Sequence, residues 1–231
     1  MLLSTMDWIA VAWSCALWAG YHFFSKYWAR DHASLLREMN RQRRDWMYKL
    51  TFRENRIADV AALANLSSSP TFFASTTIII IGGLLALLGS MSAAVDVMSK
   101  LPFIADAPET VWEIKILALL VIFVFAFFRF TWSLRLFNFS STIVGAAGLE
   151  TEFAQKGEAY RSAYADHLGA LVALASGAHN DGLRAYYFAI ATLTWFVQPA
   201  AFMITTSIVV LILFYREFRS EVLQTLLRMP R

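Results

Sequence analysis

A cluster of positive charge separates two long apolar runs near the start of this sequence and limits how the chain can be arranged. Residues 30–69, with Lys26 just before them, hold nine of the twenty basic residues. Moving such a cluster through a bilayer is costly, so basic segments between membrane spans stay in the cytoplasm. We therefore expect residues 30–69 to form a cytoplasmic arm and the N-terminus to lie outside. The basic residues of the arm are Arg30, Arg37, Arg41, Arg43, Arg44, Lys49, Arg53 and Arg56.

The composition is that of a membrane protein. Of the 231 residues, 58% are hydrophobic and only 16% are charged, and the nineteen Phe and eight Trp fall in a few long blocks. Such blocks are typical of helices that cross a bilayer. Because the basic residues flank these blocks, lipid headgroups explain them better than nucleic acid does, and we expect no nucleic-acid partner. We predict an all-α, multi-pass protein of the bacterial inner membrane, folded as a single domain over residues 1–231.

Four apolar stretches are long enough to cross the membrane as helices. We place these transmembrane helices at about residues 6–27, 72–98, 111–128 and 185–215. Pro199 stands in the middle of the fourth stretch. A proline there removes one backbone hydrogen bond, so we expect a kink in that helix.

Apolar residues of the arm recur at the spacing of one helix face. Nothing is expected to break this helix before Pro70, because proline disfavours the α conformation in the residue before it. We predict one long amphipathic cytoplasmic helix between spans one and two, which either folds back on its own protein or on lipid, or meets another copy or a partner. The apolar positions are Leu36, Met39, Trp46, Leu50, Ile57, Val60 and Ala64.

The segment before span four, residues 137–178, is predicted to lie at the inner membrane surface. Residues 137–148 either re-enter the membrane or continue span three. Residues 150–177 keep their apolar side chains on one face and Lys156, Arg161 and Asp166 off it. This pattern is typical of an interfacial amphipathic helix.

The distribution of charge agrees with this topology except at the end of the chain. Four spans with an outside N-terminus place fourteen basic residues inside and six outside. Four of those six belong to the tail after residue 215, which four spans leave outside. A fifth crossing through residues 164–178 would bring the tail inside, but that run has only about fifteen residues, short of the ~17 that a bilayer needs. We predict four spans, and the side of the tail stays open.

Small residues recur along span two. They let helix backbones approach closely in lipid, where dispersion and backbone contacts hold helices together. We predict that span two makes the tightest helix contact, through the small-residue stripe Gly82, Gly83, Ala86, Gly89, Ser90 and Ala93.

The sequence contains no motif of a known enzyme chemistry. It lacks a Gly-rich phosphate loop, His-Glu-x-x-His and Gly-x-Ser-x-Gly, and Cys15 is its single cysteine. We therefore expect no catalytic residue, metal or cofactor. Ion-coupled transport usually needs carboxylates in mid-span, and spans two, three and four have none at their centres. A pore formed by several copies stays open as an alternative, lined by Ser92, Thr192, Thr194 and Gln198.

The run that opens span four, residues 179–188, is the most distinctive part of the sequence. Asn180 or Asp181 is expected to cap the helix, and Arg184 to lie at the level of the inner headgroups. Arg184 is either a topological anchor or, with the two tyrosines after it, part of a site for a phospholipid or a partner. Arg129 at the end of span three either snorkels to the headgroups or is a functional charge. The candidate binding residues are Arg184, Tyr186, Tyr187 and Arg129.

Three motifs resemble a known family. Met6-Asp7-Trp8 opens the first span, Gly182-Leu183-Arg184-Ala185-Tyr186-Tyr187-Phe188 opens the last, and Tyr215-Arg216-Glu217-Phe218 follows it. In the order of its spans, and over most of its length, the chain resembles the bacterial and plant membrane proteins of domain-of-unknown-function family 599. The resemblance implies a multi-pass membrane protein of uncharacterised activity and brings no catalytic residue.

Together these features favour a non-catalytic inner-membrane protein that works through helix association, as a homo-oligomer or as an accessory subunit of a larger membrane complex. An oligomeric channel or pore for an ion or small solute is the first alternative. A redox or lipid-modifying enzyme subunit that uses a histidine is the second.

Overall fold

The computed structural model describes residues 3–31, 33–92, 95 and 108–229, and within these ranges the chain is helical and contains no strand. The predicted all-α fold is therefore confirmed. The elements are α1 (Thr5–Asp31), α2 (Leu35–Leu50), α3 (Ile57–Gly89), α5 (Glu109–Gly145), α6 (Glu150–Lys156), α7 (Glu158–Leu193), the short 3₁₀ helix η1 (Thr194–Phe196), α8 (Pro199–Phe218) and α9 (Glu221–Leu227).

Three stretches of the described chain are long and apolar enough to cross a membrane. They are Ile57–Gly89, Glu109–Gly145 and Pro199–Leu227, that is, α3, α5 and α8 with α9. The chain thus has the character of the membrane protein that its composition predicts. The predicted first span lies in α1, which is not one of these three stretches.

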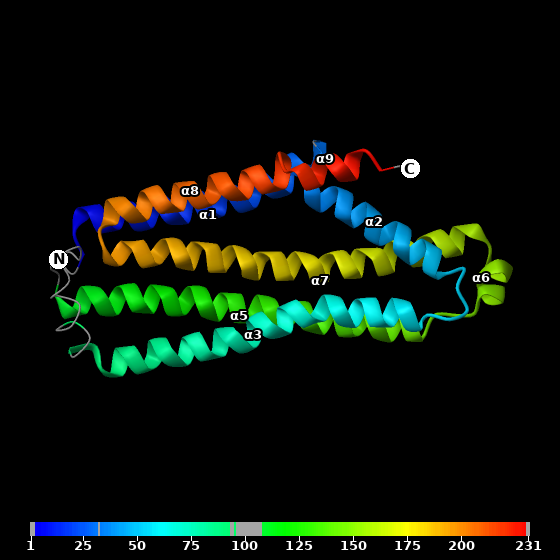
Figure 1. Ribbon diagram of the computed structural model, residues 1–231, viewed down its shortest axis with the longest axis horizontal. Helices are drawn as coiled ribbons and strands as arrows, with labels where there is room; N and C mark the ends of the chain where they lie inside the picture. The colour runs from blue at the N-terminus through cyan, green and yellow to red at the C-terminus, as the bar shows by residue number, and fades with distance from the viewer. Residues whose placement is uncertain (1–2, 32, 93–94, 96–107, 230–231) are drawn as a thin grey trace.

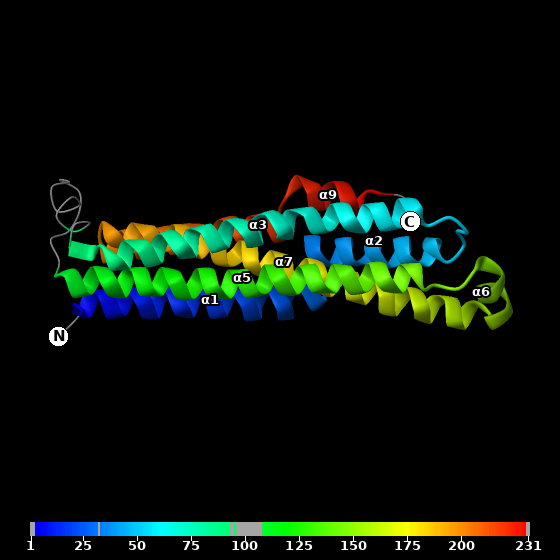
Figure 2. The same cartoon turned by 90° about the horizontal axis from the view of Figure 1, so that it is seen from below.

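The long helices lie side by side in an elongated bundle (Figure 1). α1, α8 and parts of α3, α5 and α7 lie at the end that holds the N-terminus, whereas α2 and α6 lie at the other end, as the second view also shows (Figure 2). We call the first end the apolar half, formed by residues 5–27, 71–89, 109–128, 182–193 and 199–215. The polar half is formed by α2, α6 and residues 57–70, 129–145 and 158–181.

The arm is not one helix, contrary to our prediction. α2 ends at Leu50, and α3 begins at Ile57 and continues through Pro70, which is buried. A proline inside a helix removes one backbone hydrogen bond, and here the packing around it outweighs that loss. The arm therefore folds back on its own protein, where Leu50 and Leu63 join a buried core with α5 and α7.

Charged side chains in the turn explain why the arm breaks there. Arg53 pairs with the buried carboxylate of Asp59, which also accepts a hydrogen bond from Trp46 Nε1 (2.7 Å). Arg56 Nη1 donates to the carbonyl oxygen of Ala147 just after α5 (2.6 Å). These contacts stabilise a turn. They are made by charged and main-chain groups, so the spacing of apolar residues does not predict the turn.

Span four is also not the single kinked helix that we predicted for residues 185–215. α7 ends at Leu193, the chain reverses through η1, and α8 starts at Pro199 and runs back beside α7 (Figure 1). Gln198 is extended, with φ −165° and ψ 153°, because proline disfavours the α conformation in the residue before it. Proline itself is well suited to the first position of a helix. Pro199 therefore starts a helix instead of kinking one.

Residues 137–178 belong to the bundle. Residues 137–145 continue α5, which is the second of the two alternatives for this segment. The apolar face of residues 150–177 is covered by protein, because Leu168, Val172 and Ala175 lie in the same buried core as Leu50 and Leu63.

A buried lysine links α5 to η1, the turn between α7 and α8. Lys115 is 3% exposed, and its Nζ donates to the main-chain oxygen of Trp195 (2.8 Å) and lies within 6 Å of the ring centres of Trp112, Trp195 and Phe196. Trp195 Nε1 in turn donates to Asp7 on α1 (2.7 Å). One tryptophan thus joins α1, α5 and the turn between α7 and α8.

Two glycines of α7 lie in close contact with neighbouring helices. A Cβ added to Gly182 would lie 2.5 Å from the ring of Phe130 on α5, and one added to Gly169 would lie 3.0 Å from Arg44 Cα on α2. Gly82, Gly83 and Gly89 of the small-residue stripe would meet no described atom within 4 Å, and Ala86 and Ser90 are exposed. Ala93 lies outside the described residues. The stripe thus faces outward from the single chain, and its contact with another copy stays a prediction.

We expect Gly182→Ala to destabilise the protein by about 1–3 kcal/mol, as overpacking of a core usually does, because Phe130 is fully buried. Gly83→Ala, a substitution of the same size in an open helical position, should be neutral or stabilising by up to about 1 kcal/mol. Thermal unfolding of the two variants in the same detergent measures the difference. Equal melting temperatures would contradict the close contact of α7 with α5.

Candidate functional site

Two hollows meet where the apolar half joins the polar half. The larger, of about 670 Å³, lies mainly between α2 and α7. The smaller, of about 270 Å³, has α1 on one side, α5 on the other and α7 between them. Both are lined by the same four side chains, which we call the junction residues: His22, Arg129, Asp181 and Arg184.

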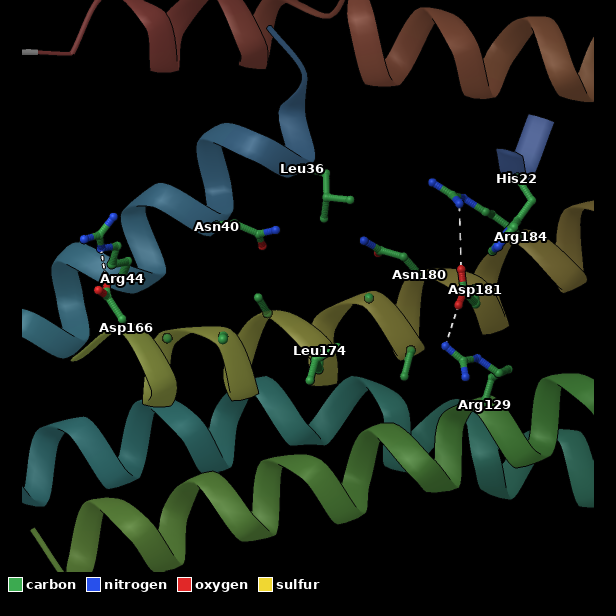
Figure 3. A pocket seen from close by; sticks show the side chains of 15 residues that line it. His22, Leu36, Asn40, Arg44, Arg129, Asp166, Leu174, Asn180, Asp181 and Arg184 are labelled. Atoms are coloured by element: carbon green, nitrogen blue, oxygen red, sulfur yellow. Dashed lines mark hydrogen bonds and ion pairs between the residues drawn. The ribbon is translucent and has the colours of Figure 1, made fainter. Parts of the chain in front are cut away.

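The junction is positively charged because two guanidinium groups share one carboxylate. Arg129 Nη2 donates to Asp181 Oδ2, and Arg184 Nη1 lies 3.7 Å from Asp181 Oδ1 (Figure 3). The Arg184 side chain is only 17% exposed and lies over the ring of Tyr21, 5.2 Å from its centre. Arg129 Nε is buried and has no hydrogen-bond partner among the described residues. Partly buried arginines with spare donors bind phosphate or carboxylate oxygens well.

The smaller hollow has aromatic walls. Trp18 of α1 stacks on Phe188 of α7, with ring centres 4.7 Å apart, and meets Phe125 of α5 edge to face at 5.9 Å. All three rings line the hollow, together with Tyr21 and the junction residues. Its inner part therefore suits hydrocarbon, and its mouth suits an anion.

The larger hollow is a wedge with a floor of small residues. Ala170, Ala173 and Gly177 on α7 leave room below, and Leu36 and Asn40 of α2 face them from above (Figure 3). α2 crosses α7 obliquely, and the two helices lie farther apart toward the start of α2 (Figure 1). The narrow end is closed by the Gly169 contact and by the ion pair of Arg44 with Asp166.

The structure brings two of the four predicted binding residues together. Arg129 and Arg184 come from different helices and meet at Asp181. Tyr186 turns toward α3 instead, where its hydroxyl lies 2.8 Å from Thr77 Oγ1. Tyr187 accepts a hydrogen bond from Arg216 Nη1 (2.7 Å) beside the junction. The predicted cluster divides because successive residues of a helix point in different directions.

The predicted pore-lining residues do not mark a path through the single chain. Thr192 is buried and donates to Phe188 O, and Thr194 donates to Ala191 O at the reversal. Gln198 and Ser92 are exposed. A pore formed between copies stays a prediction.

Sequence reasoning missed the far parts of the site. Asp181 lies inside α7 instead of capping a helix, and His22, Asn40 and Arg44 come from α1 and α2. The signal that could have located the wedge is the run of Gly and Ala at Gly169, Ala170, Ala173, Gly177 and Ala178. Within the described ranges, no three His, Cys, Asp or Glu side chains gather in a group that could hold a metal ion.

The motif Tyr215-Arg216-Glu217-Phe218, which is the last turn of α8, positions α2 above the wedge. Glu217 Oε1 accepts a hydrogen bond from the backbone N–H of Leu36 (3.0 Å), and Ser34 Oγ accepts one from Arg37 N. Both acceptors satisfy free N–H groups at the start of α2, and the Glu217 charge is favourable there. The start of α2 is therefore held by the end of α8.

Comparison with known proteins gave one match. A family model described as a protein of unknown function, DUF599, matches residues 9–222. No curated protein and no solved structure matches the chain.

We expect Glu217→Ala to loosen α2 by about 1 kcal/mol, the usual loss of a helix cap. Glu217→Gln should keep part of the contact, because an amide oxygen still accepts the hydrogen bond. Hydrogen exchange of residues 35–44 in detergent measures the effect. The exposed Glu221→Ala is the matched control and should leave exchange unchanged. If residues 35–44 exchange as slowly in Glu217→Ala as in the parent protein, the position of α2 does not depend on this contact.

Proposed function

The chain belongs to the DUF599 family, and we propose that it is a non-catalytic, multi-pass membrane protein that binds an anionic phospholipid at the junction of its two hollows. The observation that carries this proposal is the sharing of Asp181 by Arg129 and Arg184 beside an aromatic-walled hollow. The residual positive charge suits a phosphate, and the aromatic walls suit an acyl chain.

The position of the junction supports a lipid over a soluble anion. The junction lies where the apolar half of the bundle ends, which is the level of the headgroups if this half occupies the bilayer. The smaller hollow opens from there into the apolar half, between α1 and α5. A phospholipid bound with its phosphate at the arginines would place its hydrocarbon in that hollow.

The arrangement of the helices favours five crossings over four. α1, α3, α5, α7 and α8 all pass through the apolar half (Figure 1). Five crossings place the tail on the same side as the arm, so every basic residue except Lys100 and Lys115 lies inside. This arrangement removes the conflict with the orientation rule that four spans leave.

Association with a second copy is compatible with this site. Gly82, Gly83 and Gly89 face outward on α3, away from the junction residues. Exposed small residues on an apolar helix suit close contact with another helix in lipid. The homo-oligomer or accessory-subunit role proposed from the sequence would use this face.

Replacing Arg184 tests the lipid site. Lysine keeps the charge but not the two parallel donors of a guanidinium, so we expect both Arg184→Lys and Arg184→Ala to lose at least about tenfold in affinity, in line with ~1.5–3 kcal/mol for a charged hydrogen bond. Native mass spectrometry of the protein in mild detergent measures bound phospholipid. Arg135→Ala is the matched control, since Arg135 is exposed on α5 away from both hollows. If Arg184→Lys retains as much bound phospholipid as the parent protein, Arg184 acts only as a positive charge that sets the orientation of the chain in the membrane.

Reporter fusions test the five crossings. A reporter that is active only in the periplasm should be silent when fused after Arg44 and equally silent when fused after Met229. The same reporter inserted between residues 100 and 106 should be active. Activity of the fusion after Met229 would favour four spans.

A further inference from the structure

We propose that the bound phospholipid carries a hydroxyl-rich headgroup, a sugar or polyol attached to its phosphate, and that this headgroup fills the wedge between α2 and α7. This inference rests on the proposed lipid site and specifies its ligand. It is drawn from the size of the wedge, from its charge and from the chemistry of its walls.

The wedge is much larger than a phosphate requires. Its lining residues extend along α7 from Asp166 to Arg184, which is about 27 Å at ~1.5 Å per residue. Its volume is about 670 Å³, against about 270 Å³ for the smaller hollow. Arg129 and Arg184 lie at one end of the lining residues (Figure 3), so a phosphate held by them would occupy only that end. The remaining space lies on the polar side of the phosphate, where the headgroup of a phospholipid extends.

The charges of the wedge argue against a second anionic group. Of its four basic side chains, His22, Arg129 and Arg184 stand at the junction, and only Arg44 lies at the narrow end. Arg44 is already paired with Asp166. A second phosphate there would face that carboxylate and would gain no free cation. The far part of the wedge is therefore electrically balanced.

The side chains that remain are suited to hydroxyl groups. Asn40 and Asn180 carry amides, which form hydrogen bonds with hydroxyls. Asn40 Oδ1 already accepts a hydrogen bond from Arg43 Nη1 (2.7 Å), so Asn40 offers its N–H donors. Asp166 and Arg44 offer further acceptors and donors at the end of the wedge away from the junction (Figure 3). The Gly and Ala floor presents only backbone and methyl groups, on which the C–H faces of a sugar or cyclitol ring can lie. A neutral ring with several hydroxyls fits these walls better than a small, charged or purely apolar group.

Three lipids with identical acyl chains separate the hydroxyl explanation from simple charge attraction. Phosphatidic acid is a phosphate monoester of charge about −1.5 to −2 near pH 7, whereas phosphatidylglycerol and phosphatidylinositol are diesters of charge −1. Charge alone ranks phosphatidic acid first. A hydroxyl-rich headgroup site ranks phosphatidylinositol first, then phosphatidylglycerol. We expect phosphatidylinositol to bind the parent protein at least about tenfold more tightly than phosphatidic acid in native mass spectrometry.

Filling the wedge provides the matched variants. Gly177→Leu adds a side chain where no described atom lies within 4 Å of the new Cβ, and Ala173→Leu fills the same floor if the first variant unfolds. Each should lower phosphatidylinositol affinity to that of phosphatidic acid while leaving phosphatidic acid binding unchanged. Ala62→Leu, at an exposed position of α3 that lines neither hollow, is the control and should change neither.

The outcomes distinguish this inference from the function on which it rests. If the parent binds none of the three lipids, the proposed lipid site itself is wrong. If phosphatidic acid binds as tightly as phosphatidylinositol, or if the filled variants lose both lipids alike, the lipid site stands and the hydroxyl-rich headgroup is overturned. If free inositol phosphate binds as tightly as phosphatidylinositol, the ligand is a soluble phosphate, and the lipid assignment fails.

Discussion

The missing side chain at position 182 determines how α7 meets α5, and the junction of the two hollows follows from it. Without a Cβ, the backbone of α7 lies directly against the ring of Phe130. This close contact brings the neighbouring Asp181 to Arg129, the residue just before Phe130 on α5, and Arg184 follows on the same face of α7. A larger residue at 182 would move the carboxylate away from one arginine and change the balance of charge at the site.

That balance explains why the junction is suited to an anion. A buried charge is costly unless it is paired, and one carboxylate cannot fully satisfy two guanidinium groups. Tyr21 relieves part of the cost by placing its ring under Arg184, since aromatic faces attract cations. In the proposed lipid site, a phosphate that accepts hydrogen bonds from both arginines would remove the rest of this cost.

Much of the fold could be predicted from composition and periodicity, and the reasons for the errors are local. The all-α membrane character, the basic arm and the two arginines were each recognisable. Proline is misleading twice. The sequence predicts that Pro70 ends a helix, but Pro70 lies inside α3, and it predicts that Pro199 kinks a helix, but Pro199 starts α8. The backbone preference of proline is the same in both places, and tertiary packing decides the outcome. The wedge depends on contacts between residues more than a hundred positions apart, such as Gly169 with Arg44, which periodicity does not encode.

The joint made by Trp195 bears on the order in which the protein is built. Asp7 and Lys115 belong to helices that are synthesised early, but their shared partner arrives only near the end of the 231-residue chain. α7 is not one of the three stretches apolar enough to cross a membrane by themselves, and α8, which packs beside it, begins only at Pro199. In the proposed arrangement of five crossings, α7 and α8 are therefore expected to enter the bilayer together as a hairpin. Until they do, Asp7 lacks its hydrogen bond from Trp195 and Lys115 lacks its main-chain acceptor, so a chain truncated before Trp195 leaves both charged groups without these partners.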